Sequence, residues 1–242
     1  MKKIPLLLVF AVSLFPSYAS DTIKVTASNQ LIDGSFIESY TNRWSVYFVD
    51  SSGNRVQNRH WTDYGNVIEL NNNYFLHRVQ DLYGPDWSFQ SSWTNVVDHS
   101  TLLPWKFYTT SVNGQSLFYH FEENQVIFQS NSDAEYKWTS DTSSLRHKVY
   151  DWNLFGMLLV GLPFNVGNTY EIEFFDPVQK RIATLFATIE KQEDLTNQGG
   201  MPFTTHKFVT NQNLKFWVTK EAPYVIQAEL QLPNGTLFWD SY

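Results

Sequence analysis

The feature that most constrains the fold of this chain is a regular succession of short β-type runs separated by turn signals. Between residues 36 and 49, apolar side chains gather on even positions, while polar ones such as Ser39 and Arg43 fall on odd positions. The apolar members are Phe36, Tyr40, Trp44, Val46 and Phe48. Because side chains alternate between the two faces of a strand, such a run buries one face. Closely spaced turn signals, such as Asp63-Tyr64-Gly65-Asn66 and Asn71-Asn72-Asn73, predict an antiparallel meander.

One segment, between Asp151 and Leu162, has a helical pattern instead. Its apolar residues recur at spacings that place them along one stripe of a helix. They are Phe155, Leu158, Leu159 and Leu162. Asp151 is a favourable N-cap residue, and Pro163 stops the helix. Because the segment is apolar nearly all round, we expect a short and largely buried helix.

Together these patterns predict a mainly β protein. Its expected fold class is a strongly curved antiparallel sheet, or an incomplete barrel, packed on one short buried helix that covers the concave face. The sequence contains no repeat or linker, so residues 20–242 are expected to form a single β-rich half-barrel domain, with Asp141–Ser144 as a loop. Asn234-Gly235 is predicted to close a late hairpin, with a positive φ at both residues.

The first 19 residues have the organisation of a secretory signal peptide. Met1-Lys2-Lys3 is a short positive segment, Ile4 to Phe15 is almost entirely apolar, and cleavage is expected after Ala19. The apolar stretch is shorter than the ~20 residues that a membrane-spanning helix needs. We therefore expect an exported, periplasmic protein that has no transmembrane helix after cleavage, with association with the outer membrane as a further option.

Composition and motif searches argue against several functions. The chain has no Cys, which excludes disulfides, thiolate catalysis and Cys-ligated metals. Its net charge of −7 argues against a nucleic-acid partner, because phosphate binding needs basic surfaces. The six His lack metal-ligand spacing, and the sequence has no serine-nucleophile or nucleotide-binding motif. We therefore predict that the protein is not an enzyme and has no catalytic residue, no cofactor and no metal. The acidic pairs Glu122-Glu123 and Glu171 with Glu173 are expected on solvated surfaces.

The aromatic content is the most informative feature for function. The chain has nine Trp, and aromatic residues make up 17% of it. Packing in the core of a half-barrel accounts for most of them, since each ring buries a large area. A surplus that faces an open concave surface would suit a lipid tail, a sugar ring or a peptide. The candidate ligand-facing residues are Trp138, Trp152, Phe155 and Trp217.

Several motifs of the second half, in this order, resemble a known family. They are Val149-Tyr150-Asp151, Leu162-Pro163-Phe164, Gly167-Asn168-Thr169-Tyr170, Leu214-Lys215-Phe216-Trp217-Val218 and Asn234-Gly235-Thr236-Leu237. Over roughly residues 35–240 the chain is similar to a family of exported bacterial proteins catalogued as a domain of unknown function. The resemblance implies a sheet curved around a helix, similar to the half-barrels of periplasmic lipoprotein carriers, which hold acyl chains on their concave face. It implies no catalytic residue.

These observations favour a periplasmic, non-catalytic protein that binds or carries an apolar or amphipathic, lipid-like ligand in the cell envelope. Other envelope proteins are a second class of partner that the sequence leaves open. One alternative is an integral outer-membrane β-barrel, because such barrels often end in an aromatic residue and this chain ends in Tyr242. Another alternative is an envelope enzyme without a recognisable motif.

Overall fold

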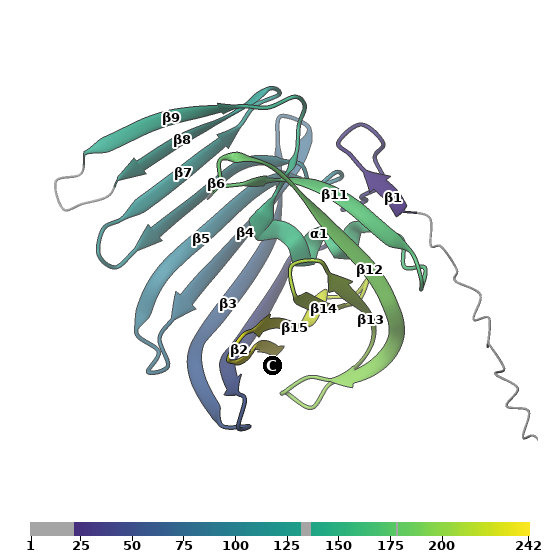
Figure 1. Cartoon of the computed structure of the whole chain (residues 1–242). Helices are drawn as coiled ribbons and strands as arrows, with labels where there is room; N and C mark the ends of the chain where they lie inside the picture. Colours follow the sequence, from purple (N-terminus) through teal and green to yellow (C-terminus); the bar gives the residue numbers. More distant parts are fainter. Residues whose placement is uncertain (1–21, 132–136, 178) are drawn as a thin grey trace, which may run out of the picture.

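One curved β-sheet dominates the computed structural model of the chain, which describes residues 22–131, 137–177 and 179–242 (Figure 1). The sheet wraps around a short helix, and this arrangement confirms the predicted fold class. The predicted signal peptide, residues 1–19, lies outside the described residues.

Sixteen strands form the sheet. In chain order they are β1 (Thr22–Val25), β2 (Tyr40–Asp50), β3 (Arg55–Leu70), β4 (Asn73–Tyr83), β5 (Phe89–Asp98), β6 (Pro104–Ser111), β7 (Ser116–Phe121), β8 (Gln125–Asn131), β9 (Trp138–Ser144), β10 (Tyr150–Asp151), β11 (Thr169–Asp176), β12 (Arg181–Thr196), β13 (Pro202–Thr210), β14 (Leu214–Val218), β15 (Val225–Leu232) and β16 (Gly235–Ser241). The long strand β12 bends strongly along its length and carries the sheet around the helix (Figure 1).

The order of the strands explains how the sheet closes around its interior. Strands that are consecutive in sequence lie side by side in two runs, β2 to β9 and β11 to β16, and the runs join where β16 pairs with β2. Pairing within these runs is antiparallel, as predicted, whereas β1 and β10 each pair with β11 in parallel. In the described part of the chain, β1 and β9 are the two end strands and do not pair with each other, so the sheet is open.

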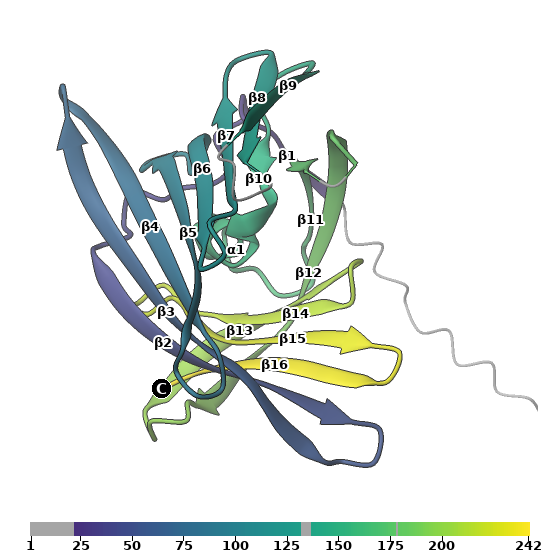
Figure 2. The ribbon, with the colours of Figure 1, turned by 90° about the vertical axis from the view of Figure 1, so that its left-hand side faces the viewer.

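The helical segment lies inside the curve of the sheet. It begins with a 3₁₀ turn, η1 (Trp152–Leu154), and continues as α1 (Phe155–Gly161). As predicted, Asp151 caps its start, because the carboxylate accepts a hydrogen bond from the Asn153 amide at 3.1 Å. Figure 2 shows α1 with β5 and β6 on one side and β13 to β16 below it. Every residue of α1 except Gly156 is buried.

Two hydrophobic clusters hold this arrangement together. The larger surrounds α1 and includes Leu158 and Leu159. The smaller lies between β6 to β8 and β11, where the ring centroids of Phe128 and Phe175 are 5.4 Å apart. An ion pair of exposed side chains, Lys180 and Asp141, links the turn before β12 to the edge strand β9. The run β2 to β9 and the run β11 to β16 therefore also meet through side chains, near the end strands of the sheet.

The predicted turn at Asp63–Asn66 is wrong, because these residues lie inside β3. Gly65 pairs with Tyr40, and a Cβ built on Gly65 would lie 2.1 Å from Tyr40 Cε1. The glycine therefore makes room for an aromatic ring on the neighbouring strand. Asp is common in turns, but Asp63 is buried and forms an ion pair with Arg78 in the interior.

The hairpin between β15 and β16 also differs from the prediction. It turns at Pro233-Asn234, since Leu232 pairs with Gly235. Pro presets the φ that suits the first turn position, and this moves the turn back by one residue. Of the predicted pair, Gly235 has a positive φ, 153°, and Asn234 does not. A Cβ on Gly235 would lie 2.2 Å from the Val49 carbonyl oxygen, so close approach to β2 explains the glycine.

The expected loop at Asp141–Ser144 is part of β9, which pairs with β8. These residues are polar and mostly exposed because β9 lies at the edge of the sheet. The polar composition of these four residues is therefore that of an edge strand, and sequence alone does not distinguish such a strand from a loop.

Gly65→Ala is expected to lower the free energy of unfolding by about 1–3 kcal/mol, the usual cost of overpacking. The Tyr40 ring has little room to move, because it is buried and its hydroxyl lies 3.3 Å from Asp63 Oδ1. Urea unfolding of the purified protein measures the change. Gly199→Ala is the control, since a Cβ there would lie no closer than 3.3 Å to any neighbour, the nearest atoms being Asn197 Oδ1 at 3.3 Å and the Tyr242 carbonyl carbon at 3.5 Å. Equal losses at the two glycines would contradict the packing explanation.

Candidate functional site

A mainly apolar cavity of about 360 Å³ lies between α1 and the concave face of the sheet. Its walls come from β2, β3 and β4, from β14, β15 and β16, and from η1 and α1. The lining residues are Trp44, Trp61, Arg78, Gln80, Trp152, Asn153, Phe155, Gly156, Gln212, Leu214, Phe216, Val225, Ala228, Leu230 and Trp239. Segments that are far apart in sequence thus form one cavity because the sheet curves around the helix.

Strand alternation decides which side chains reach this cavity. On β14, Leu214 and Phe216 line it. Lys215 lies between them in sequence and so projects from the other face, where its ammonium group is 2.9 Å from the Glu229 carboxylate. On β4, Arg78 and Gln80 are likewise two residues apart and share the inner face. The cavity therefore has an apolar part contributed by β14 and β15 and a polar part contributed by β4.

Four tryptophans, Trp44, Trp61, Trp152 and Trp239, form what we call the aromatic wall of the cavity. Trp61 packs edge-on against Trp239, with ring centroids 6.0 Å apart. Trp61 also contacts Trp93, which packs edge-on against Trp152 at 6.0 Å. Such tilted contacts are the favoured geometry of aromatic pairs. A continuous layer of rings therefore runs from β16 through β3 and β5 to η1.

The indole N–H groups of the aromatic wall are buried and lack a hydrogen-bond partner within the described part of the chain. The same is true of the Ser241 hydroxyl, which belongs to the residue paired with Trp44 across β16 and β2. A buried donor without an acceptor costs about 1–3 kcal/mol. Since buried polar groups are nearly always paired, several such donors around one cavity are unusual. The aromatic wall thus has donor capacity that the chain itself does not use.

The polar part of the cavity is built on a buried ion pair between Arg78 and Asp63. Arg78 Nε and Nη2 donate to Asp63 Oδ1 and Oδ2 at 3.0 and 2.6 Å, and Nη1 donates to the Asn153 carbonyl at 3.1 Å. Burial lowers the pKa of Arg78, but the adjacent carboxylate more than offsets this and holds the pKa above its ordinary value. Burial has the opposite effect on the Tyr40 hydroxyl beside Asp63 and raises its pKa. Arg78 therefore stays charged, and the Asp63 carboxylate, 2.6 Å from its Nη2, compensates that charge.

A second buried carboxylate, Asp151, lies behind this surface. Asn95 Nδ2 donates to Asp151 Oδ2 at 2.7 Å, and Asn153 Nδ2 donates to Asn95 Oδ1 at 2.8 Å and Gln80 Oε1 at 3.2 Å. Burial raises the pKa of Asp151 to about 7, although hydrogen bonds from Asn153 and Asn95 oppose the shift. These contacts connect the start of the helical segment to β4 and β5.

Two of the four candidate ligand-facing residues line this cavity, and two do not. Trp152 and Phe155 lie in its wall. Trp217 is on the other face of β14, where its Nε1 donates to Glu193 Oε1 at 2.8 Å. Trp138 is 53% exposed on the edge strand β9 and lines a separate surface hollow with Tyr108. The structure therefore brings together the two aromatic residues of the helical segment and leaves the other two elsewhere.

Sequence reasoning did not select Trp44, Trp61 and Trp239, although one signal was available. Trp44 belongs to the buried, even-numbered face of the run at residues 36–49, and it pairs directly with Trp61. On β14, Phe216 lines the cavity and Trp217, the next residue, lies on the opposite face because strand side chains alternate.

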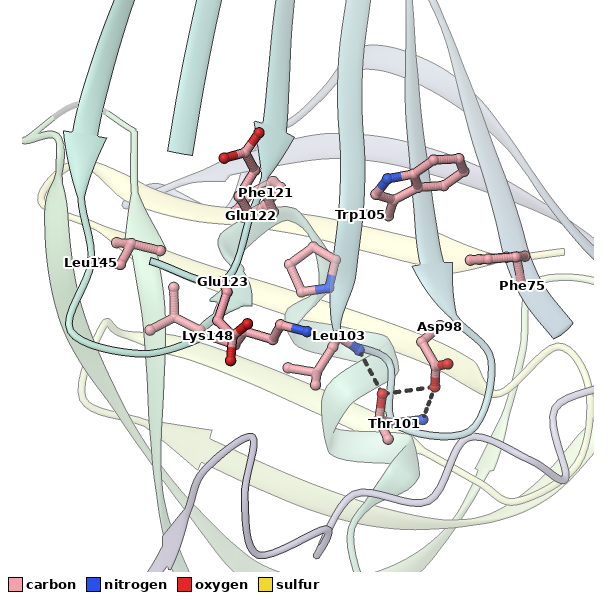
Figure 3. A pocket seen from close by; sticks show the side chains of 12 residues that line it. Phe75, Asp98, Thr101, Leu103, Trp105, Phe121, Glu122, Glu123, Leu145 and Lys148 are labelled. Carbon is pink, nitrogen blue, oxygen red and sulfur yellow. Dashed lines mark hydrogen bonds between the residues drawn. The ribbon is translucent and has the colours of Figure 1, made fainter. Parts of the chain in front are cut away.

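A second hollow of about 360 Å³ lies at the ends of β4 to β7 and is less suited to binding a ligand (Figure 3). Its acidic side chains are held by their own turns. Asp98 Oδ1 accepts hydrogen bonds from the backbone amide and hydroxyl of Thr101, at 2.8 and 2.7 Å, and Glu122 accepts one from Gln125. Burial raises the pKa of Asp98, but these bonds and one from Ser100 outweigh it and leave the pKa below its ordinary value. Asp98 thus serves as a turn-forming carboxylate.

No group of three or more His, Asp or Glu is arranged to hold a metal ion in the part of the chain that is described. Over the same residues, no helix is both long and apolar enough to cross a membrane.

The fold and the cavity define a class of protein: an open, curved β-sheet around a short buried helix, with an aromatic cavity between them. The chain belongs to the family described as "Protein of unknown function (DUF3108)", whose model matches residues 40–238. The match confirms that the domain resembled in the sequence is one of unknown function. No curated protein and no solved structure matches the chain significantly.

Asp151 is expected to make the protein less stable as the pH rises from about 4 to about 7. Its pKa is about 7 in the folded protein and near 3.8 in the unfolded chain, so the folded state binds more protons in this range. Asp151→Asn removes this titration. The difference in unfolding free energy, wild type minus variant, should therefore fall between pH 4.5 and pH 7.5 in urea titrations.

The control for this measurement is Asp86→Asn. Asp86 is exposed, and hydrogen bonds from Ser88 lower its pKa below the ordinary value. Its titration is complete below the measured range, so the corresponding difference should stay constant. A constant difference for Asp151→Asn as well would show that the buried carboxylate does not titrate there.

Proposed function

We propose that this protein is a non-catalytic binding protein for an amphipathic, lipid-like ligand, held in the cavity between α1 and the concave face of the sheet. One observation carries the proposal: the cavity combines the aromatic wall with amide side chains on its polar side. Ligand sites are typically concave and mostly apolar, with a few placed polar groups. An amphipathic molecule is the class of ligand that matches both parts.

The size of the cavity limits the ligand. Ligand pockets span about 300–1,000 Å³, and this cavity, at about 360 Å³, lies near the lower end. It suits one acyl chain or one small ring system rather than a lipid with several chains. We therefore propose a single-chain amphipath.

The aromatic wall supports this choice energetically. Trp61, Trp152 and Trp239 are partly exposed, so their rings offer accessible apolar surface to a ligand. Each Å² of apolar surface removed from water contributes about 25 cal/mol. A ligand oxygen that reached an indole N–H after a small ring rotation would also give that donor the partner it lacks. Apolar contact and donor pairing would thus favour the same occupant.

We also propose that the protein acts in the periplasm. The supporting feature is the N-terminal segment, in which Lys2 and Lys3 precede the apolar run of residues 4–15. An integral barrel is not proposed, because β1 and β9 do not pair in the part of the chain that the structure describes and a membrane barrel requires closure.

Filling the cavity tests the proposal. Leu230 lines the cavity, whereas the next residue, Gln231, is exposed and so is expected on the outer face of β15. Leu230→Trp should weaken binding of the uncharged fluorophore N-phenyl-1-naphthylamine by at least about tenfold, equivalent to about 1.4 kcal/mol. Gln231→Trp adds the same ring outside the cavity and should bind as the wild type does.

Fluorescence titration measures the affinities, and circular dichroism checks that both variants keep the fold. Equal affinities for all three proteins would place the binding site elsewhere. Failure of the wild type to bind the fluorophore in a saturable manner would count against a ligand cavity altogether.

A further inference from the structure

We infer that the polar group of the ligand is uncharged, so that the cavity takes a neutral single-chain amphipath, such as a monoacylglycerol, in preference to a fatty acid or a phosphate ester. The inference rests on the proposed binding function and specifies its ligand. The observations that carry it are the charges on the cavity wall and the way in which they are already paired.

Arg78 is the only ionisable residue among the described residues that line the cavity. Its charge is compensated by Asp63, whose carboxylate oxygen lies 2.6 Å from Nη2. Both side chains are buried, at 8% and 3% exposure. Because the two charges lie side by side in the interior, the wall that a ligand meets has no net charge from this pair.

One hydrogen-bonding edge of Arg78, formed by Nε and Nη2, is already bound to Asp63. A guanidinium binds carboxylates or phosphates by two parallel bonds, and here Nε and Nη2 donate to Asp63. The remaining nitrogen, Nη1, donates to the Asn153 carbonyl. A ligand anion that bound the remaining N–H groups would place a second negative charge beside a cation that Asp63 already compensates. The pair therefore opposes anionic ligands.

The other polar side chains on the cavity wall are amides. They are Gln80, Asn153 and Gln212. Amides offer both donors and acceptors, which match a hydroxyl or an ester that needs a partner but no counter-charge. Because Asn153 Nδ2 already donates to Gln80 Oε1 and Asn95, the amide groups outside these bonds are Asn153 Oδ1, Gln80 Nε2 and the exposed Gln212 side chain. The acidic Asp151, two residues from Asn153, adds no positive charge to this region. An anion would therefore lose its hydration without gaining a cation in return.

Matched ligands with one chain length test the inference. At pH 8, where laurate is ionised, 1-monolaurin should displace N-phenyl-1-naphthylamine from the wild-type protein at a concentration at least about tenfold lower than laurate. Dodecyltrimethylammonium, the cationic counterpart, should also be weaker than 1-monolaurin. Each ligand is used below the concentration at which it forms micelles.

A charge added to the cavity wall should alter this preference. Gln212 lines the cavity but is itself exposed, so Gln212→Lys changes the wall without disturbing the core. The variant should bind laurate at least about fivefold more tightly than the wild type, so the preference for 1-monolaurin over laurate should shrink by at least that factor. Gln231→Lys, which adds the same charge outside the cavity, should leave both affinities as they are.

The outcomes separate the two proposals. If the wild type binds laurate as tightly as 1-monolaurin, or if Gln212→Lys leaves the laurate affinity unchanged, the inference of a neutral ligand is wrong while the cavity remains a binding site. If none of the ligands displaces the fluorophore, or the fluorophore itself does not bind, both proposals fail.

Discussion

The buried ion pair between Asp63 and Arg78 is the interaction on which the interior of this protein depends. It joins β3 to β4, and through the Asn153 carbonyl it fastens the helical segment to the sheet. Breaking such a pair by removing one partner typically costs about 3–5 kcal/mol, because the other charge is left buried and alone. The position of η1, and with it the polar side of the cavity, therefore depends on this ion pair together with the hydrogen bonds of Asn153 to β4 and β5.

The cavity follows from the same arrangement. A seven-residue helix is too short to fill the concave face of a sixteen-stranded sheet. The hydrogen bonds of Asn153 to Asn95 and Gln80 hold the start of the helical segment against β4 and β5. Space remains between α1 and the strands β14 to β16, and tryptophans from three strands and η1 surround it. Among the described residues, the indole N–H groups of these tryptophans are buried without a hydrogen-bond partner, and each such donor costs folding free energy.

The sequence predicted the type of fold, and two of its four candidate ligand-facing residues line the cavity. The helical stripe and its Asp151 cap were readable because they depend on residues within one turn of each other. Gly65 was misread as part of a turn because the reason for it, the ring of Tyr40, lies on another strand. Trp152 and Phe155 were found through their place in the helical segment, whereas Trp61 and Trp239 depend on how distant strands come together.

By itself the sequence determined local structure: alternating strands, one buried helix and a chain rich in aromatic residues. Periodicity and capping act between neighbours in sequence, and they carry this information directly. Only the tertiary structure decided which face of each strand lies inside, which tryptophans share a cavity, and that Asp63 and Arg78 neutralise each other there. The physical reason is that strand register and sheet curvature arise from contacts between segments far apart in the chain, and a shift of one residue reverses every side chain on a strand.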